Sequence, residues 1–268
     1  MEPARSKNLV YSVEKAFRVL QAFSSREPEL LLSEVARVAD TDNATAFRML
    51  NTLVHLGYVE KVIGSKRFRL TLKCLDLGFN AIAHMDLRTM ARPVLEKLAV
   101  SGVGAASIGI LDHGDVIYIE RLQVGLTRLS VDIRVGTRIP AFCSAIGRAI
   151  LALLPEDRQR NELERRPRPR LTPTTETDLE RLIAILARVR ADRIALVDQE
   201  SVVGLTAIAA PIVGLDRLPI AAISMATASS AMDAEHFREQ FRGPLLEAAE
   251  TLSKALEAAG GIIGGPTD

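Results

Sequence analysis

The sequence has no tryptophan, and aromatic residues make up only 4% of its 268 residues. Because 48% of the residues are hydrophobic, the chain can bury large cores, and these cores must be mainly aliphatic. The longest apolar runs, such as residues 208–213, are far shorter than a membrane-spanning helix requires. The N-terminus lacks the apolar run of a signal peptide. We therefore expect a soluble, cytoplasmic protein with no membrane partner.

Metal-binding and phosphate-binding motifs are also missing. The two cysteines, Cys74 and Cys143, and the four scattered histidines show none of the spacings of a zinc site, and a disulfide framework is not expected. No Gly-x-x-x-x-Gly-Lys loop occurs. An enzyme would need Cys143 or Ser144 as nucleophile, and the neighbouring sequence offers no histidine as its base. We expect neither a cofactor nor a catalytic activity.

The net charge is only +1, which on its own argues against a nucleic-acid-binding protein. The charges are, however, unevenly distributed. Residues 1–73 hold 12 Lys and Arg against 8 Asp and Glu, a balance of +4, whereas the rest of the chain holds 22 against 25, a balance of −3. A basic N-terminal part joined to a mildly acidic part suits a DNA-binding domain attached to a domain of another kind.

Two short helices are expected in residues 32–57, joined by a polar turn at 40–43 whose side chains can bond to their own backbone. The first helix begins at Ser33, a residue type that caps helices. The second runs from about Ala44 to Leu56 and is followed by Gly57, because glycine commonly follows the last helical residue. This arrangement predicts a helix-turn-helix.

The second of these helices has an apolar face and a polar face at helical spacing. The polar face carries side chains of the kind that read base edges in a DNA major groove. The residues expected to contact DNA from this helix are Thr45, Phe47, Arg48 and Asn51. The alternative is the solvated face of an ordinary amphipathic helix.

A basic hairpin follows, with strands expected at 58–59 and 68–70 and a turn at 64–65. Three cations on the turn and the returning strand are expected to contact DNA phosphates: Lys66, Arg67 and Arg69. With a further helix at about 12–23, these elements make a winged helix-turn-helix domain.

Several blocks of the sequence resemble the IclR family of bacterial transcriptional regulators, over nearly the whole chain. They are SVEKAFRVLQAF, LSEVARVAD, TAFRMLNTLVHLGYVE, RFRLTLKCLDLG, RIPAFCSAIGRAILALLP and ALVDQESVVGLTAIAAPI. The AFCS and VDQE stretches resemble the branch of protocatechuate and hydroxybenzoate regulators, which control aromatic-acid catabolism. Ala44 and Phe47 depart from the polar residues usual in the family. Phe47 would either meet a thymine methyl group or turn inward.

Three segments are expected: a winged helix-turn-helix domain (1–71), a linker helix (72–86) and an effector-binding domain (87–268). Pro93 should distort a helix at about 87–100 unless a new helix starts just before it. Further strands are expected at about 105–111, 116–121, 128–133, 194–197, 206–213 and 218–226, and helices at about 144–154, 176–192 and 233–259. This order implies an α+β domain with a largely antiparallel sheet. The family resemblance implies a GAF-like fold.

A small-molecule site is expected at the start of the helix at 144–154, where the resembled family binds its effectors. Ser144, Ala145 and Ile146 would present backbone amides to a carboxylate, or Ser144 only caps the helix and Cys143 is a small buried hydrophobe. The other candidates for this site are Arg134, Cys143, Asp198, Glu200 and Ser224, with Arg121 as a second carboxylate clamp. The alternative for these acids and arginines is a structural or surface role.

These features predict a ligand-responsive transcription factor of catabolic genes. It would bind double-stranded palindromic promoter DNA as a homodimer or a dimer of dimers, and the resemblance implies pairing through the DNA-binding domain and linker. A small organic acid, aromatic by resemblance, would be its effector. The alternative is a constitutive DNA-binding or architectural protein whose second domain only oligomerises. The arginine-rich run at 165–170 is expected to be a solvated loop, since it lacks interleaved aromatic residues.

Overall fold

A computed structural model of the chain describes residues 9–24, 26–77, 86–99, 104–123 and 133–259. The chain divides into two compact units, Met1–Ala81 and Ile82–Asp268, each with its own hydrophobic core. The boundary falls inside the segment where the sequence pattern places a linker. No helix in the described ranges combines the length and apolar character needed to cross a membrane.

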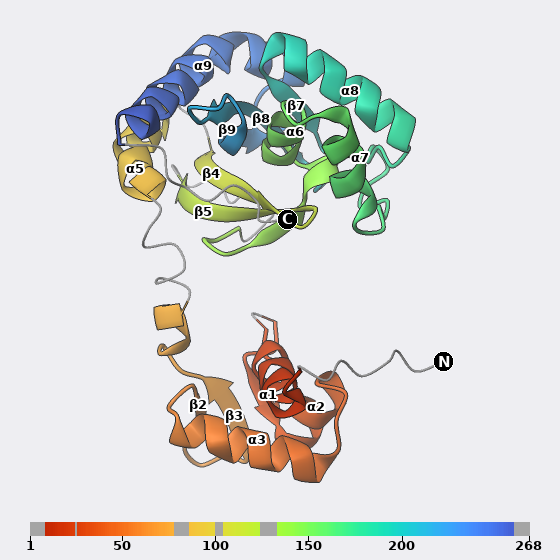
Figure 1. Ribbon diagram of the computed structural model, residues 1–268, viewed down its shortest axis with the longest axis vertical. Coiled ribbons are helices and arrows are strands. Elements are labelled where there is room, and N and C mark those ends of the chain that lie inside the picture. Colours follow the sequence, from red (N-terminus) through yellow and green to blue (C-terminus); the bar gives the residue numbers. More distant parts are fainter. Residues whose placement is uncertain (1–8, 25, 78–85, 100–103, 124–132, 260–268) are drawn as a thin grey trace. The chain divides into compact units, whose positions relative to one another are not determined.

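The first unit packs three helices against a small antiparallel sheet (Figure 1). Its elements are α1 (Tyr11–Gln21), β1 (Glu29–Leu31), α2 (Leu32–Val38), α3 (Asn43–His55), β2 (Val59–Lys61) and β3 (Arg67–Leu70). Strand β3 lies between β1 and β2, and its Phe68 packs into a core with Val19, Leu50 and Leu53. This is the expected winged helix-turn-helix. Strand β1 is an addition that the sequence pattern does not predict.

The start of α2 differs from the sequence-based expectation. The helix begins at Leu32, with Leu31 as its N-cap residue, so Ser33 is the second helical residue and does not cap it. The carboxylate of Glu34 instead accepts a hydrogen bond of 2.7 Å from the Leu31 backbone N–H. A glutamate three residues after the cap satisfies a donor that the helix itself leaves free, which explains why no Ser or Thr is needed at the cap.

The expected linker helix is described only at its beginning. Residues 74–77 are helical, whereas 78–85 lie outside the described residues. The described portion exposes Leu72, Leu75 and Leu77 to solvent. These side chains are apolar surface that the first unit does not itself cover.

The second unit is a six-stranded antiparallel sheet with helices on both faces (Figure 1). Its elements are α5 (Asp86–Ala99), β4 (Ala105–Asp112), β5 (Asp115–Gln123), β6 (Arg138–Pro140), the short 3-10 helix η1 (Ala141–Cys143), α6 (Ala145–Leu151), α7 (Glu156–Glu164), α8 (Leu179–Asp192), β7 (Ala195–Asp198), β8 (Leu205–Val213), β9 (Pro219–Ala228) and α9 (Ala234–Ala258). The strand order is β6-β5-β4-β9-β8-β7. Helices α5 and α9 cover one face, and α6 and α8 cover the other. The expected α+β fold is confirmed.

Two details of the second unit correct the sequence-based expectation, and a third expected element lies mostly outside the described residues. Helix α5 continues through Pro93 without a break, because its buried residues on either side, Leu87 and Leu95 among them, anchor both halves on the sheet. Helix α7 is not predicted, since Leu163 is its only buried apolar residue and gives no helical periodicity. Of the strand expected at 128–133, only Ile133 is described, and it is not in a strand.

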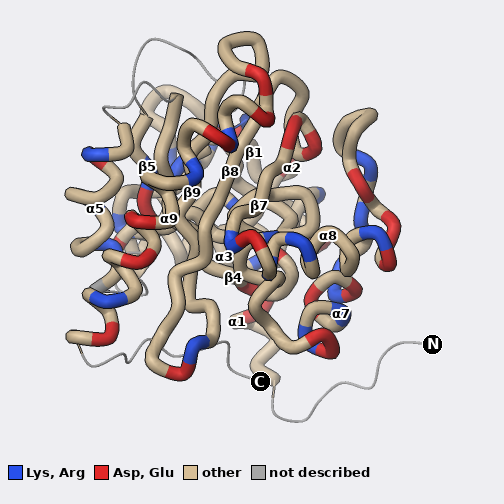
Figure 2. The backbone as a smooth tube through the Cα atoms, turned by 90° about the horizontal axis from the view of Figure 1, so that it is seen from above, with Lys and Arg blue, Asp and Glu red and all other residues tan. Residues whose placement is uncertain are grey.

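The arginine-rich run at 165–170 is a loop, as expected, and its charges are used locally. Arg165 pairs with Glu162, and Arg166 pairs with the buried Asp115 at 3.0 Å. Arg168 donates to the carbonyls of Leu163 and Thr177. Charges of both signs also alternate along the neighbouring helices α7 and α8 (Figure 2). The run therefore does not form a separate basic patch.

Candidate functional site

Helix α3 buries one side and leaves the other open to solvent. Ala46, Leu50 and Leu53 are its buried residues, whereas Phe47 and Arg48 are exposed and Asn51 is half-buried. The Arg48 guanidinium has no hydrogen-bond or ion-pair partner in the ranges that the structure describes. A helix that keeps a cation, an amide and a ring free on one face can contact a surface outside the chain.

The N-terminus of α3 is fixed by Asp42. Its side chain accepts from the Thr45 backbone N–H at 2.8 Å and from the Thr45 hydroxyl at 2.7 Å. These two hydrogen bonds hold the pKa of the Asp42 carboxyl below its usual value. The Thr45 hydroxyl, predicted to face DNA, thus already donates inside the cap.

The three wing cations are not equivalent. Lys66, at the turn, is exposed and has no partner among the described residues. Arg67 donates to the Glu29 carbonyl at 2.8 Å and pairs with Glu34 at 3.1 Å. Arg69 pairs with Glu60 at 2.6 Å and approaches Glu29 at 3.7 Å. Two of the three predicted phosphate contacts are therefore offset by acids of the same domain, and Lys66 carries the free charge.

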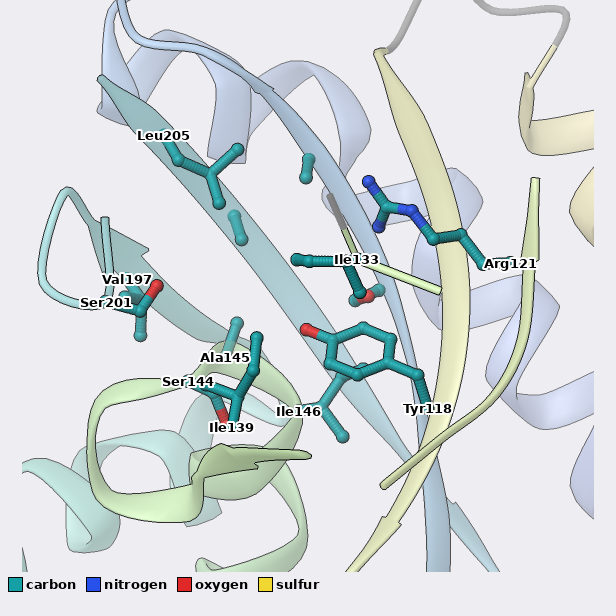
Figure 3. Close-up of a pocket in the computed structure, with 13 residues that line it drawn as sticks. Tyr118, Arg121, Ile133, Ile139, Ser144, Ala145, Ile146, Val197, Ser201 and Leu205 are labelled. Carbon is teal, nitrogen blue, oxygen red and sulfur yellow. The ribbon is translucent and has the colours of Figure 1, made fainter. Parts of the chain in front are cut away.

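The second unit contains a pocket between the start of α6 and the sheet, with lining residues from strands β5 to β9 (Figure 3). It is lined by Tyr118, Arg121, Ile133, Ile139, Ser144, Ala145, Ile146, Val197, Ser201, Leu205, Ala207, Ser224 and Ala226. Most of these side chains are apolar, with three serines, one phenol and one guanidinium among them. The space that the centre of a water molecule can reach is about 20 Å³, enough for roughly one water.

Arg121 is the unusual residue of this pocket. Its guanidinium extends from β5 toward the pocket (Figure 3) and donates to the Ser107 hydroxyl at 3.0 Å. Its Nε is buried and has no hydrogen-bond partner, and the described part of the chain places no carboxylate against it. Burial lowers the pKa of Arg121, although the group stays charged. A partly buried cation without a counter-ion is costly to the fold and attracts an anion.

Tyr118 precedes Arg121 on strand β5, and its hydroxyl points into the pocket (Figure 3). Burial raises the pKa of Tyr118 to about 12. The phenol therefore stays protonated at neutral pH and can donate a hydrogen bond. Sequence reasoning misses Tyr118, because an aromatic residue in a short β-type run is ordinarily part of a core.

The start of α6 is shaped by close packing. Ser144 is its N-cap and accepts from the Gly147 backbone N–H at 3.0 Å. A Cβ on Gly147 would lie 2.3 Å from the Ala141 carbonyl oxygen, so only glycine lets η1 fold back against the helix. This fold brings Ser144, Ala145 and Ile146 to the pocket wall, opposite Ser224 of β9.

Four predicted effector-site residues do not line the pocket. Cys143 is fully buried, with a pKa that burial raises to about 12, so its thiol is neutral and a poor nucleophile. Asp198 accepts a hydrogen bond from the Thr206 hydroxyl at 2.6 Å. The exposed Arg134 is at a turn, where its backbone N–H donates to the Thr137 hydroxyl.

The fourth, Glu200, is committed to a buried ion pair. Both of its carboxylate oxygens accept from Arg148 of α6, at 2.5 and 2.6 Å. Arg148 is 2% exposed and also donates to the Phe142 carbonyl at 2.8 Å. The Glu200 carbonyl in turn accepts from the Thr175 hydroxyl. This pair ties α6 to the loop that carries Ser201, and sequence alone cannot join partners 52 residues apart.

Comparison with protein-family models matches both units. Residues 12–62 match the IclR helix-turn-helix domain, and residues 79–254 match the model described as bacterial transcriptional regulator IclR C-terminal. Among curated proteins, the Pca regulon regulatory protein of Pseudomonas putida is 31% identical over 91% of this chain and 84% of its own length. The regulator XynR of Escherichia coli is 29% identical over 92% of this chain and 98% of its own length.

Solved structures give the same picture. A transcriptional regulator from Rhodococcus sp. RHA1 is 36% identical and superposes with a TM-score of 0.81, covering 92% of this chain and 98% of that chain. An IclR homologue from Microbacterium hydrocarbonoxydans, solved in complex with 4-hydroxybenzoate, is 27% identical with a TM-score of 0.79, covering 92% and 99%.

Proposed function

Because this chain belongs to the IclR family of bacterial transcriptional regulators, we propose that an aromatic carboxylic acid, bound in the pocket of the second unit, controls its binding to promoter DNA. The coarser part of this statement, a DNA-binding transcriptional regulator rather than an enzyme, is what the family match shows. The effector class and the residues that contact DNA and effector are the proposal.

The observation that carries the effector class is the unneutralised charge of Arg121. Its buried Nε lacks an acceptor among the described residues, and the other described side chains that line the pocket carry hydroxyl groups or are apolar. A carboxylate would supply both the missing acceptor and the missing negative charge, and an arginine can bind it with two parallel hydrogen bonds. A neutral effector would leave the guanidinium without a counter-ion, so the site favours an anion.

The remaining lining favours a ring. Ile133, Ile146, Val197 and Leu205 give an apolar surface, and the Tyr118 hydroxyl can donate to a polar substituent. The names of relatives agree: the Pca regulon regulatory protein and the p-hydroxybenzoate hydroxylase transcriptional activator are both similar to this chain, at 31% and 27% identity. The homologue solved with 4-hydroxybenzoate carries the same type of ligand.

The pocket must widen to admit such a ligand. A benzene-sized cavity has a volume of roughly 150 Å³, whereas the space found here is about 20 Å³. Binding therefore selects a form of the second unit with its pocket walls further apart. A ligand that prefers one of two conformations shifts their populations, and this is how occupancy would change DNA binding.

We also propose that the chain acts as a homodimer on palindromic DNA. Helix α1 exposes Val13 and Phe17 one turn apart, with Val10 just before the helix, and the short helical turn after β3 exposes Leu75 and Leu77. Apolar side chains repeated on one helix face are suited to pairing with a second copy. A two-fold dimer would match the symmetry of a palindrome.

The effector proposal is tested by thermal shift and calorimetry with 4-hydroxybenzoate and protocatechuate, and with the matching neutral amides. The acids are expected to raise the melting temperature with dose, and the amides to bind far more weakly. Arg121→Met should lose acid binding, Arg121→Lys should keep part of it, and Arg92→Met, at an exposed position on α5, should bind like wild type. Equal binding of acid and amide, or acid binding unchanged in Arg121→Met, would refute the carboxylate clamp.

The DNA-binding proposal is tested with a duplex selected in vitro by the full chain. Arg48→Ala is expected to weaken binding to this duplex by about 1–3 kcal/mol and to relax the base preference at one position per half-site. Effector binding should be unaffected, since Arg48 belongs to the other unit. Unchanged affinity and specificity in Arg48→Ala would show that α3 presents a different face. If no effector changes the affinity for the duplex, the result would favour the alternative of a constitutive DNA-binding protein.

A further inference from the structure

Phe47 is an aromatic residue on a face made otherwise of polar and small side chains. Phe47 is 48% exposed, because the core of the same unit lies on the opposite side of α3. On a helix, residues three and four apart are neighbours, so Phe47 lies between Ala44 and Asn51. Helical side chains lean toward the N-terminus, over the turn that holds Ala44. The single methyl group of Ala44 is too small to cover the ring.

The surroundings of the ring indicate what covers it. Residues 43–55 contain no aspartate or glutamate, and the free guanidinium of Arg48 is the next side chain along the helix. Lys66 of the wing adds a second free cation in the same unit. Such a face fits a polyanion better than an apolar protein surface. In the major groove of DNA, the C5-methyl group of thymine is the apolar group that a side chain can contact.

We infer that Phe47 is a specificity-determining residue that reads thymine methyl groups beside the bases contacted by Arg48 and Asn51. The inference rests on the proposed placement of α3 in the major groove. It assigns to Phe47 an apolar readout that is independent of hydrogen bonding. The operator should therefore contain a thymine at one or two fixed positions of each half-site, and its 5-methyl group should be what the protein detects.

The test uses the full chain and the in vitro selected duplex, with each thymine replaced in turn by deoxyuridine, which removes only the methyl group. Wild type should lose affinity by about fourfold for each contacted methyl, the value expected for one buried carbon. Phe47→Ala should bind the thymine and uracil duplexes equally, and Phe47→Leu should retain part of the difference. Leu56→Ala, at an equally exposed apolar residue beyond the end of α3, should discriminate like wild type.

The outcomes separate this inference from the function on which it rests. If wild type loses no affinity when uracil replaces thymine at any position, the methyl readout is overturned while sequence-specific binding stands. The same holds if Phe47→Ala loses as much affinity on this replacement as wild type does. Selection of no specific duplex would instead overturn the placement of α3 on DNA and the inference with it. Circular dichroism of Phe47→Ala checks that substitution at this exposed position leaves the fold intact.

Discussion

The two candidate sites of this chain each contain an arginine that meets no counter-ion among the described residues, but the two arginines have opposite surroundings. Arg48 stands exposed on α3, where water solvates its charge. Arg121 lies in the wall of a largely apolar pocket with its Nε buried. An exposed cation without a counter-ion lowers the stability of the fold little, so its presence does not indicate a ligand. The role of Arg48 is inferred from its position on the outer face of α3. A buried free cation is unfavourable to folding, and its presence itself points to an anionic ligand.

A third arginine makes the comparison sharper. Arg148 is even more buried than Arg121, yet its guanidinium is fully used by Glu200 and the Phe142 carbonyl. Burial alone therefore does not distinguish a structural arginine from a ligand-binding one. The distinction lies in whether the chain itself supplies the carboxylate. Arg148 should matter for stability and Arg121 for effector affinity.

The largest expected effect tests this division. Replacing Glu200 by Gln, or Arg148 by Met, leaves one buried charge unpaired and should lower the free energy of unfolding of the second unit by about 3–5 kcal/mol. Arg121→Met removes a partly buried charge that has no counter-ion in the described part of the chain, and it should leave the stability unchanged or raise it. Urea denaturation followed by circular dichroism, without effector, measures all three variants.

The double variant Arg148→Met with Glu200→Gln is the control, because it removes both charges together. It should recover much of the stability that either single change loses. A large loss in Arg121→Met, or a negligible loss in Glu200→Gln, would erase the proposed difference between the two arginines.

The same contrast explains how far the sequence could predict each site. The face of α3 is contiguous in the chain, so helical periodicity alone places Arg48 and Asn51 outward. The pocket is assembled by sheet register from strands far apart in sequence, such as β5 and β9, and no local pattern joins Tyr118 to Ser224. Ser144 to Ile146 could be named because a helix start is a local feature and the resembled family binds its effectors there.

The ion pairs that the sequence does not reveal have the same physical origin. Glu200 stands in a block that resembles effector regulators, but its partner Arg148 is distant in sequence, and its structural role is visible only in the fold. Arg67 and Arg69 read as free cations because the acids that offset them lie on the unpredicted strand β1, on α2 and on β2. Long-range pairing, rather than secondary structure, limits the inference from sequence.

A smaller effect is expected from the wing, and it tests whether offset cations behave as the structure indicates. Lys66→Ala should weaken DNA binding equally for all sequences and reduce the slope of log affinity against log salt by about 0.9 for each phosphate that the lysine neutralises. The pair Arg69→Ala with Glu60→Ala should leave the slope nearly unchanged, because it removes one charge of each sign. Fluorescence anisotropy over a salt series measures both slopes. A larger reduction of the slope in the double variant than in Lys66→Ala would show that Arg69 leaves Glu60 to bind phosphate.

The smallest expected effect concerns the exposed charge of Asp42, the N-cap residue of α3. Because its pKa is lowered in the folded chain by the hydrogen bonds from Thr45, the ionised carboxylate stabilises the start of α3 at neutral pH. This stabilisation is present above the unfolded pKa of about 3.9 and is lost as the pH falls through that value toward the lower folded pKa. Asp42→Asn keeps a capping oxygen without the titration.

Hydrogen exchange of peptides covering α3, corrected for intrinsic rates, measures this effect. Wild type should protect α3 better than Asp42→Asn at neutral pH, and the difference should shrink as the pH drops below about 4. The change should be confined to the first turns of α3, since a solvated charge acts only over a short range. Protection in the pocket strands β5 and β9 should be the same in both proteins. A pH-independent difference would show that Asp42 caps α3 through its shape and not through its charge, unlike the buried charges of the second unit.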